Sequence, residues 1–229
     1  MLFYVIIGLG TLAGWMLSSR LKSKFKKYST VPIRSGKSGA EVAQDMLDHF
    51  GVRDVKIVEG RGFLSDHYNP LKKTIALSPN VYRGRNVSAA AVAAHECGHA
   101  VQHKEAYQML KVRSSLVPAV QASSRIQQLL FIGLIFGMVA GTGAFGSLIL
   151  LALVVTFGLT ALFALVTLPV EFDASRRALL WLDNTGTAHG AEYDGAKDAL
   201  WWAAMTYVAS ALSALVMFLY FLLMFAGRD

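Results

Sequence analysis

The sequence predicts a mainly α-helical membrane protein with about four transmembrane helices and a small α+β unit that contains a short β-ribbon. Hydrophobic residues make up 54% of the 229 residues, and the mean hydropathy of +0.44 is too high for an ordinary soluble domain. The apolar residues are gathered in blocks, and most of the polar residues lie between the first block and the second.

Three uncharged blocks account for the predicted spans, at residues 2–17, 129–170 and 205–226. A bilayer core needs about 20 helical residues, so the block 129–170 is long enough for two spans. The glycine-rich segment 141–146 predicts the hairpin between them. Basic residues at 20–27 directly follow the first block, which favours an uncleaved anchor over a signal peptide.

The distribution of positive charge predicts the orientation. Of the 22 Lys and Arg residues, 18 lie in the segment 18–128 and 3 in the segment 169–204. Because cytoplasmic segments carry an excess of Lys and Arg, we expect both segments in the cytoplasm and the N-terminus outside the cell membrane. The net charge of +7 is then explained by anionic lipid, and no aromatic-plus-basic motif predicts a nucleic-acid partner.

The chain is expected to form one membrane-embedded domain over residues 1–229. Its predicted segments are an N-terminal anchor (1–19), a cytoplasmic α+β unit (28–128), a two-span hairpin (129–170), a cytoplasmic helix (171–204) and a C-terminal span (205–229). Small residues at Gly133, Gly137 and Gly141 permit close helix contact, either between the second and third spans or in a homo-oligomer.

The cytoplasmic unit begins with a polar linker and a short helix. Ser38 and Glu41 have the spacing of a capping box, apolar residues follow at helical intervals, and Gly51 supplies the stop. Two strands are predicted next, at residues 55–59 and 73–77, with a turn-rich loop between them.

The most specific motif is His95-Glu96-Cys97-Gly98-His99, in an alanine-rich stretch that predicts a helix beginning near Asn86 or Ser88. Four-residue spacing places His95 and His99 on one helix face, where both imidazoles can bind one Zn²⁺. Glu96 is then the predicted catalytic residue, a general base toward water at that metal. The alternative is a helix whose two histidines are ordinary surface or core residues.

Cys97 is the single cysteine, so the chain forms no intramolecular disulfide. It lies about 200° around the helix from His95, and we expect its side chain in the core rather than on the metal.

A catalytic zinc site needs a third protein ligand. A continuous helix carries His103 about 6 Å beyond His99, too far for a Zn–N bond of about 2.0–2.1 Å. Glu171 is the preferred candidate, because a carboxylate directly after an apolar block is costly without a partner. The alternative is an acid at the start of a helix, favoured by the helix dipole and by Arg176 or Arg177.

These features resemble the membrane-bound neutral zinc metallopeptidases of the bacterial YugP type, and more distantly the HtpX-type proteases and prenyl-protein endopeptidases. The resemblance covers nearly the whole chain: the anchor, the segment 65–70, the His95–His99 helix, the hairpin and the segment 171–175. It implies a zincin-like catalytic unit with one catalytic Zn²⁺ and Glu171 as a ligand.

In the distant relatives, the glutamate ligand begins an E-x-x-A-D motif. Glu171 and Ala174 match it, whereas Ser175 stands where those groups carry Asp. An Asp there would orient a zinc-bound histidine by a hydrogen bond from outside the ligand set. Ser175 is the candidate replacement for it in this role. Asp173 is expected to point to a different face.

The candidate hydrogen-bond donors to a transition-state oxyanion are His67, Tyr68 and Arg177. The alternative for His67 and Tyr68 is that they only form part of a turn. In zinc peptidases of this kind a sheet edge runs beside the metal, and an extended substrate pairs with it as an added strand. The segment 73–77 is the expected edge, with an ordinary two-stranded ribbon as the alternative.

The sequence therefore predicts a zinc-dependent integral-membrane endopeptidase that acts on membrane or juxtamembrane proteins at the cytoplasmic face of the bilayer. The alternative from another class is a non-enzymatic membrane scaffold or transporter with an incidental or structural metal site. Within the enzymes, a zinc hydrolase of a lipid or another amide is the second choice.

Overall fold

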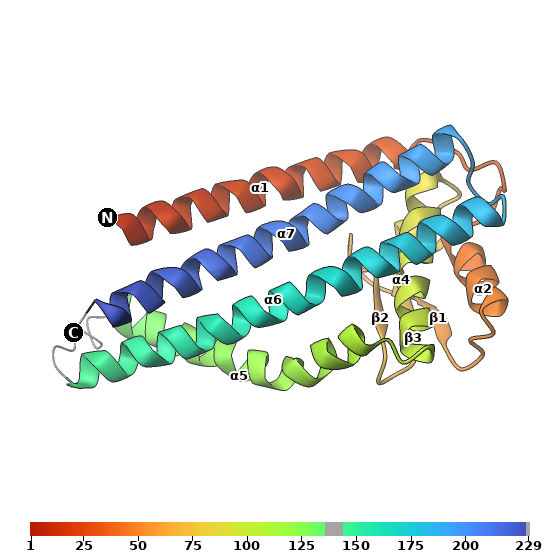
Figure 1. Cartoon of the computed structure of the whole chain (residues 1–229). Helices are drawn as coiled ribbons and strands as arrows, with labels where there is room; N and C mark the ends of the chain where they lie inside the picture. The colour runs from red at the N-terminus through yellow and green to blue at the C-terminus, as the bar shows by residue number, and fades with distance from the viewer. Residues whose placement is uncertain (136–143, 228–229) are drawn as a thin grey trace. The chain divides into compact units, whose positions relative to one another are not determined.

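The computed structural model describes residues 1–135 and 144–227 (Figure 1). Within these residues the chain forms seven α-helices and three β-strands. The elements are α1 (Leu2–Ser29), α2 (Gly39–His49), β1 (Lys56–Glu59), β2 (His67–Asn69), β3 (Thr74–Leu77), α3 (Pro79–Tyr82), α4 (Val87–Lys104), α5 (Gln108–Ile135), α6 (Ala144–Asn184) and α7 (Ala191–Ala226).

The chain divides into two compact units. The helical unit comprises Met1–Trp15, Lys111–Leu168 and Tyr207–Asp229, and the mixed unit comprises Met16–Leu110 and Pro169–Thr206. All strands and the complete helices α2, α3 and α4 belong to the mixed unit. The organisation as a single domain stays a prediction.

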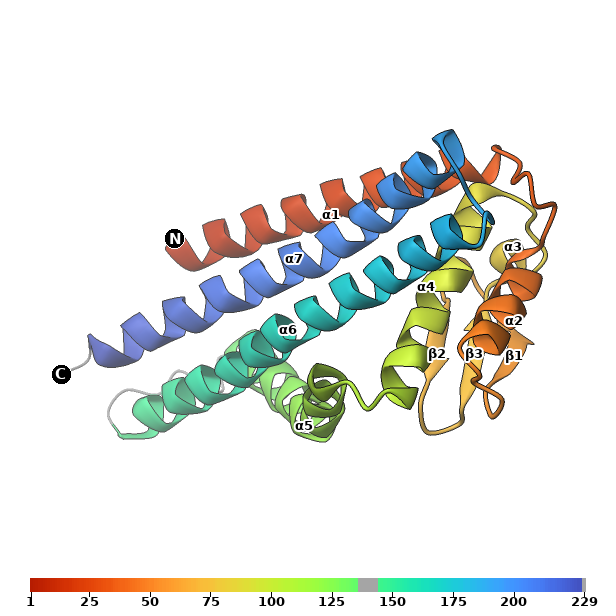
Figure 2. The ribbon, with the colours of Figure 1, turned by 45° about the vertical axis from the view of Figure 1, so that its right-hand side comes forward.

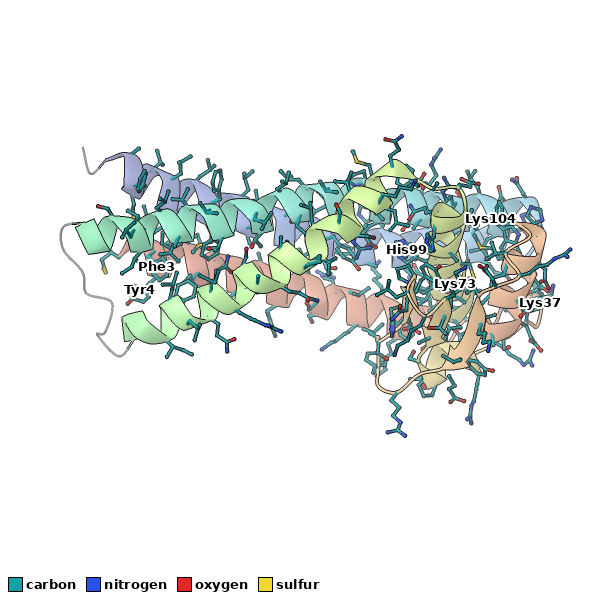
Figure 3. All side chains as sticks on the ribbon, turned by 90° about the horizontal axis from the view of Figure 1, so that it is seen from below. Phe3, Tyr4, Lys37, Lys73, His99 and Lys104 are labelled. Carbon is teal, nitrogen blue, oxygen red and sulfur yellow. The ribbon has the colours of Figure 1, made fainter. Side chains whose placement is uncertain are left out.

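Aromatic side chains pack together in the helical unit. The ring centroids of Phe3 on α1 and Phe131 on α5 lie 6.2 Å apart, and Phe157 on α6 stacks on Phe221 of α7 at 5.1 Å. Figure 3 shows Phe3 with its neighbour Tyr4 near the start of α1. The rings of Phe131 and Phe157, whose centroids lie 6.2 Å apart, connect these two pairs. Such contacts add to the energy of apolar burial, so together they join α1, α5, α6 and α7.

Three of the described helices are long and apolar enough to cross a membrane: Leu2–Ser29, Gly146–Asn184 and Ala191–Ala226. They contain the predicted first, third and fourth spans. The predicted second span begins in α5, but its continuation, with Gly137, Gly141 and the start of the hairpin, lies outside the described residues. The count of four spans is therefore not confirmed.

α4 is central to the mixed unit, where α2, α3 and the strands β2 and β3 all contact it (Figures 1 and 2). The predicted helix caps are present. Ser38 and Glu41 form the capping box of α2, and the Asn86 side chain accepts a hydrogen bond from the backbone of Ala89 at the start of α4. Gly51 follows α2 with a φ of 64°, a conformation that favours glycine.

The buried face of α4 consists mainly of small side chains, which allow neighbouring backbones to approach closely. These residues are Ala89, Ala90, Ala91, Ala93, Ala94, Cys97, Gly98 and Ala100. At the other end of the helix, the Lys104 ammonium donates to the carbonyl oxygen of Phe50 and so joins α4 to the end of α2.

The sheet has three strands where the sequence predicted a two-stranded ribbon. β1 and β3 confirm the two predicted strands, and they pair in parallel. β2 pairs antiparallel with β3, which gives the order β1-β3-β2. The prediction that 73–77 forms the edge is therefore wrong, because that segment provides the central strand. β2 forms the sheet edge beside α4. With only 3 residues among turn-forming neighbours, β2 is too short to show the alternating pattern of apolar and polar residues by which a strand is predicted.

Two helices extend beyond their predicted ends. α1 continues to Ser29, past the predicted anchor at 1–19. α6 runs without a break through Pro169 to Asn184, so Glu171 lies inside a helix rather than at the start of one. The predicted helix at 171–204 is divided between the end of α6 and the start of α7.

Candidate metal centre

α4 places the two motif histidines one turn apart. The helix is continuous from Val87 to Lys104, and the rings of His95 and His99 lie 4.8 Å apart in a T-shaped arrangement. The side chains are mostly buried, with exposed fractions of 14% for His95 and 9% for His99. Both Nε2 atoms point toward the same carboxylate on α6.

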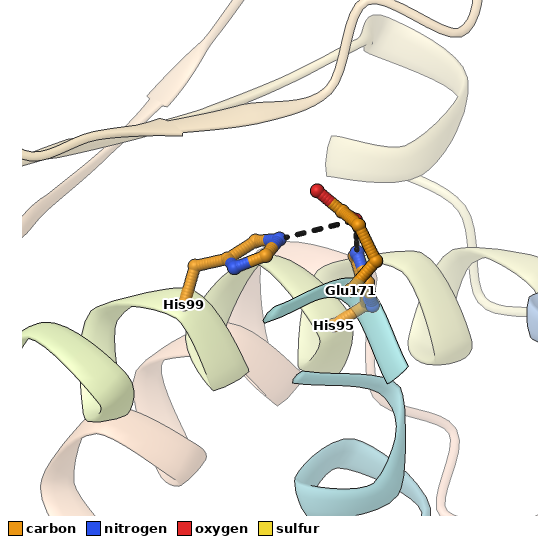
Figure 4. A group of neighbouring side chains, drawn as sticks. All are labelled: His95, His99 and Glu171. Carbon is orange, nitrogen blue, oxygen red and sulfur yellow. Dashed lines mark ion pairs between the residues drawn. The ribbon is translucent and has the colours of Figure 1, made fainter. Parts of the chain in front are cut away.

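That carboxylate belongs to Glu171, whose side chain is only 3% exposed. Its Oε2 lies 3.4 Å from Nε2 of His95 and 3.5 Å from Nε2 of His99. Figure 4 shows the carboxylate facing both rings. Ligand atoms of the three residues all lie within 4.8 Å of one another. The structure thus brings together the three residues that the sequence predicts as metal ligands.

The distances fit a metal better than direct hydrogen bonds. Hydrogen bonds from nitrogen to oxygen span about 2.7–3.2 Å, shorter than both separations. Ligands at about 2.1 Å from a tetrahedral Zn²⁺ lie about 3.4 Å from each other. Two neutral imidazoles and one carboxylate are also a donor set that catalytic zinc uses, so the residues fit this ion.

Gly98 lets α6 come close enough to present Glu171. A Cβ atom at this position would lie 2.6 Å from the backbone oxygen of Ala174 and 3.1 Å from its Cα. No side chain fits there without movement of one helix. The glycine inside the histidine motif is therefore a packing requirement of the site.

His95 is held from behind by Ser175. The Ser175 hydroxyl oxygen lies 3.1 Å from Nδ1 of His95, on the side of the ring opposite the atom that faces Glu171. If Nδ1–H donates to Ser175, the lone pair of Nε2 is left for a metal. Ser175 lies where its predicted role requires, although that role itself stays a prediction.

His99 is held by Gln102, a fully buried side chain that sequence reasoning missed. The Gln102 nitrogen donates to the carbonyl oxygen of Val170 at 2.8 Å and to Oδ2 of Asp173 at 2.9 Å. Both partners only accept, so the amide oxygen must face His99, where it lies 3.0 Å from Nδ1. An amide oxygen cannot donate, so Nδ1 carries the proton and Nε2 has a lone pair for the metal.

Asp173 acts on His99 through Gln102, which the sequence reasoning did not foresee. The Asp173 carboxylate also accepts hydrogen bonds from Arg176 at 2.6 Å and from Arg177 at 2.5 Å. Arg177 further donates to Glu105 at 2.6 Å. Arg177 was predicted as an oxyanion donor; the structure places it on these two carboxylates, and its donor role stays a prediction.

Glu96 is buried beside β2. Its Oε2 accepts a hydrogen bond of 2.9 Å from the backbone N–H of Tyr68. Tyr68 lies opposite Ile75 of β3 in the sheet, but the N–H of Tyr68 donates to Glu96 instead of to β3. The edge of β2 that is not paired with β3 therefore faces α4. The strand and the predicted catalytic residue thus lie side by side.

The other oxyanion-donor candidates differ in environment. The phenol of Tyr68 lies 2.7 Å from Nδ1 of His103, and burial, with the charge of Asp54, raises the pKa of Tyr68 to about 12. The phenol therefore keeps its proton at neutral pH. His67 is exposed, and its Nδ1 lies 2.9 Å from the carbonyl oxygen of Ser65. His103 contacts Tyr68 and is not in the metal cluster.

The electrostatics of the cluster favour positive charge. Burial by itself lowers the pKa of His99, but the contact with Glu171 and the charge of Glu96 raise it above its ordinary value. The same carboxylates would favour a bound cation.

Cys97 is outside this cluster, as predicted. Its thiol is buried and donates to the carbonyl oxygen of Ala43, and burial raises the pKa of the thiol well above its usual range.

Comparison with known proteins agrees with the geometry. The family described as "Putative neutral zinc metallopeptidase" matches residues 3–226. A relative from Bacillus subtilis (strain 168), named "Putative membrane protease YugP", is 43% identical over 230 residues, which cover 100% of this chain and 98% of the relative. No solved structure matches significantly. The chain therefore belongs to the neutral zinc metallopeptidase family, and it is a membrane protein of that family.

Proposed function

We propose that this chain is a zinc-dependent endopeptidase that hydrolyses peptide bonds of membrane or juxtamembrane proteins at the cytoplasmic face of the bilayer. The observation that carries the proposal is the meeting of His95, His99 and Glu171 beside the buried carboxylate of Glu96. His95, His99 and Glu171 would hold one Zn²⁺, and Glu96 would be the catalytic residue.

When bound, Zn²⁺ polarises a carbonyl group and lowers the pKa of a coordinated water to about 7. Glu96 would accept the proton of the attacking water on its carboxylate and then pass it to the leaving amine. Ser175 and Gln102 would keep the two imidazoles in the tautomers that bind metal. The neutral phenol of Tyr68 supports its candidacy as a donor to the carbonyl oxygen.

The edge of β2 supports a peptide substrate. Tyr68 offers its backbone N–H on the side of the strand that faces Glu96. An extended substrate that pairs with this edge would exchange main-chain hydrogen bonds with β2, as in β-strand addition. The N–H of Tyr68 would then bond to the substrate instead of to Glu96, which would release the carboxylate for proton transfer.

Two features support substrates in or near the membrane. Glu171 follows the apolar block 129–170 in the sequence, and an 18-residue window of α6 is strongly apolar. A cavity of about 500 Å³ in the mixed unit includes Ser175, and Phe172, Leu180 and Trp201 provide apolar parts of its wall. A hydrophobic segment next to the scissile bond would fit such a lining.

Replacing Glu96 by Gln tests the function. The variant should retain one zinc per chain and lose peptide cleavage by about 10²–10⁴-fold, since it keeps the shape but not the base. Glu59→Gln, on β1, is the matched control and should keep full activity. A non-enzymatic scaffold or transporter would retain its cellular function with Glu96→Gln, and that result would reject the proposal.

Substrate class and orientation need separate measurements. Purified enzyme in liposomes should cut reconstituted membrane proteins much faster than soluble casein, and equal rates would contradict the restriction to membrane substrates. For orientation, an impermeant maleimide on intact cells should label a cysteine that replaces Tyr4 but not one that replaces Lys72. The reverse pattern would place the site outside the cytoplasm.

A further inference from the structure

A second cavity in the mixed unit lies apart from the metal centre. Its volume is about 500 Å³. The lining residues come from the end of α1, the β1–β2 loop, α3 and the cap of α4: Lys22, Phe25, Lys26, Ser29, Phe63, Asn80 and Asn86. None of them is a residue of the metal cluster or one of its hydrogen-bond partners.

The polar lining offers donors and no carboxylate. Lys22 and Lys26 lie one turn apart on α1, so both ammonium groups can reach the same ligand. Asn86, which also lines the cavity, uses its side-chain oxygen for Ala89 and Ser88, so its amide N–H groups are the part that can donate to a ligand. Asn80 adds a second amide. Such a lining matches a ligand with negative charge and several acceptor oxygens.

The two lysines are not neutralised within the described part of the chain. No carboxylate there forms an ion pair with Lys22 or Lys26, whereas Lys24, on another face of the helix, pairs with Asp198 at 2.7 Å. Their charge is therefore available to a ligand. Two ammonium groups that share one cavity also repel each other, and a bound anion would relieve that repulsion.

The cavity also has an apolar wall. Phe25 is buried, and its ring meets the ring of Phe63 edge-to-face at 5.4 Å between centroids. The side chain of Phe63 is 52% exposed, which is a large apolar surface to leave in contact with water. A ligand that combines an anionic group with an apolar portion would cover the ring and satisfy the donors together.

The place of the lysines in the sequence indicates the source of that ligand. They follow the uncharged block 2–17 by about one and a half to two and a half helical turns, the position at which a membrane helix meets the lipid headgroups. We propose that this cavity binds the phosphate headgroup of an anionic phospholipid, with Lys22 and Lys26 on the phosphate and Phe63 against the glycerol and ester region. The site does not depend on the proposed peptidase activity.

The test is lipid binding by the full chain, purified in detergent and measured by native mass spectrometry with phosphatidylglycerol and phosphatidylcholine. Wild type should retain phosphatidylglycerol in preference to phosphatidylcholine. The double variant Lys22→Ala/Lys26→Ala should bind phosphatidylglycerol about 25-fold more weakly, because each lysine near an anionic phosphate contributes about fivefold. Phe63→Ala should also weaken binding.

The charge-matched control is Arg20→Ala/Lys27→Ala, which removes two positive charges from the same segment but none from the cavity. It should keep wild-type lipid binding. Equal losses in both double variants would show diffuse attraction and overturn the proposal, as would full retention by Lys22→Ala/Lys26→Ala. Free phosphate is the other possible ligand, and melting temperatures distinguish it. The lipid assignment is wrong if inorganic phosphate raises the melting temperature of wild type as much as phosphatidylglycerol does and has no effect on Lys22→Ala/Lys26→Ala.

Discussion

The side-chain nitrogen of Gln102 donates to Oδ2 of Asp173 over 2.9 Å, and this contact decides which face the Gln102 oxygen presents to His99. Residues 71 positions apart in the chain thereby set the tautomer of one imidazole. An error in that orientation would place the proton of His99 on the atom that must bind the metal.

Gln102 should therefore control metal affinity. Gln102→Leu removes both the acceptor for His99 and the donor to Asp173, and zinc binding should weaken about 10–100-fold, the usual effect of losing such a supporting contact. Competition with a chromophoric chelator measures the dissociation constant. Gln44→Leu on α2, whose amide donates to Asp48, is the control. Unchanged zinc affinity in Gln102→Leu would contradict the tautomer argument.

Glu171 should be required for zinc and His103 should not. Glu171→Ala removes one of three donors that lie within 4.8 Å of each other, so the purified variant should lose most of its metal. His103→Ala loses a contact with Tyr68 and should retain one zinc per chain. Metal content by atomic emission separates the two. Loss of zinc in His103→Ala, with retention in Glu171→Ala, would reverse the ligand assignment.

Gly98→Ala should destabilise the contact between α4 and α6. The added methyl group would lie 2.6 Å from the backbone oxygen of Ala174, and overpacking of this kind costs about 1–3 kcal/mol. A lower melting temperature and weaker zinc binding should appear together, because the shift moves Glu171. Gly14→Ala on α1 has no atom within 4 Å of the new Cβ and should behave as wild type. A normal melting temperature in Gly98→Ala would show that the helices do not approach so closely.

Glu41 should make the stability of the mixed unit sensitive to acid. The backbone N–H of Ser38, and then Arg85, lower the pKa of Glu41 from 4.5 to about 2. This stabilising contribution is complete above pH 4.5 and is lost as the pH falls from 4.5 toward 2. Thermal unfolding should show Glu41→Gln to be less stable than wild type at pH 7, with the difference shrinking below pH 4.5. A difference that is constant with pH would contradict this role.

The capping hydroxyl of the same helix gives a companion measurement. Ser38 accepts a hydrogen bond from the backbone of Glu41, and loss of such a cap costs about 0.5–2 kcal/mol. Ser38→Ala should lower the free energy of unfolding by that amount at all pH values, whereas Ser29→Ala, which removes only a bond to the preceding turn, should have little effect. If the two variants are equally stable, the cap does not stabilise α2.

Local spacing accounts for most of what the sequence determined by itself. The spacing of His95 and His99 depends only on the helical repeat, so one face of α4 could be predicted without any knowledge of packing. The caps of α2 and α4 are also local patterns, and the strands at 56–59 and 74–77 were long enough to be found. Apolar blocks identified three helices that can span a membrane.

Apart from Glu171, which the sequence already pointed to by its place after an apolar block, tertiary structure decided which distant segments meet. Only the close approach of α4 and α6, permitted by Gly98, brings Ser175 to His95 across 80 residues and makes Asp173 an indirect partner of His99. The edge position of β2 likewise depends on the pairing order of the sheet, which no pattern within three residues can encode. Helical and strand periodicity is a property of neighbours in the chain, whereas these contacts depend on how whole elements pack.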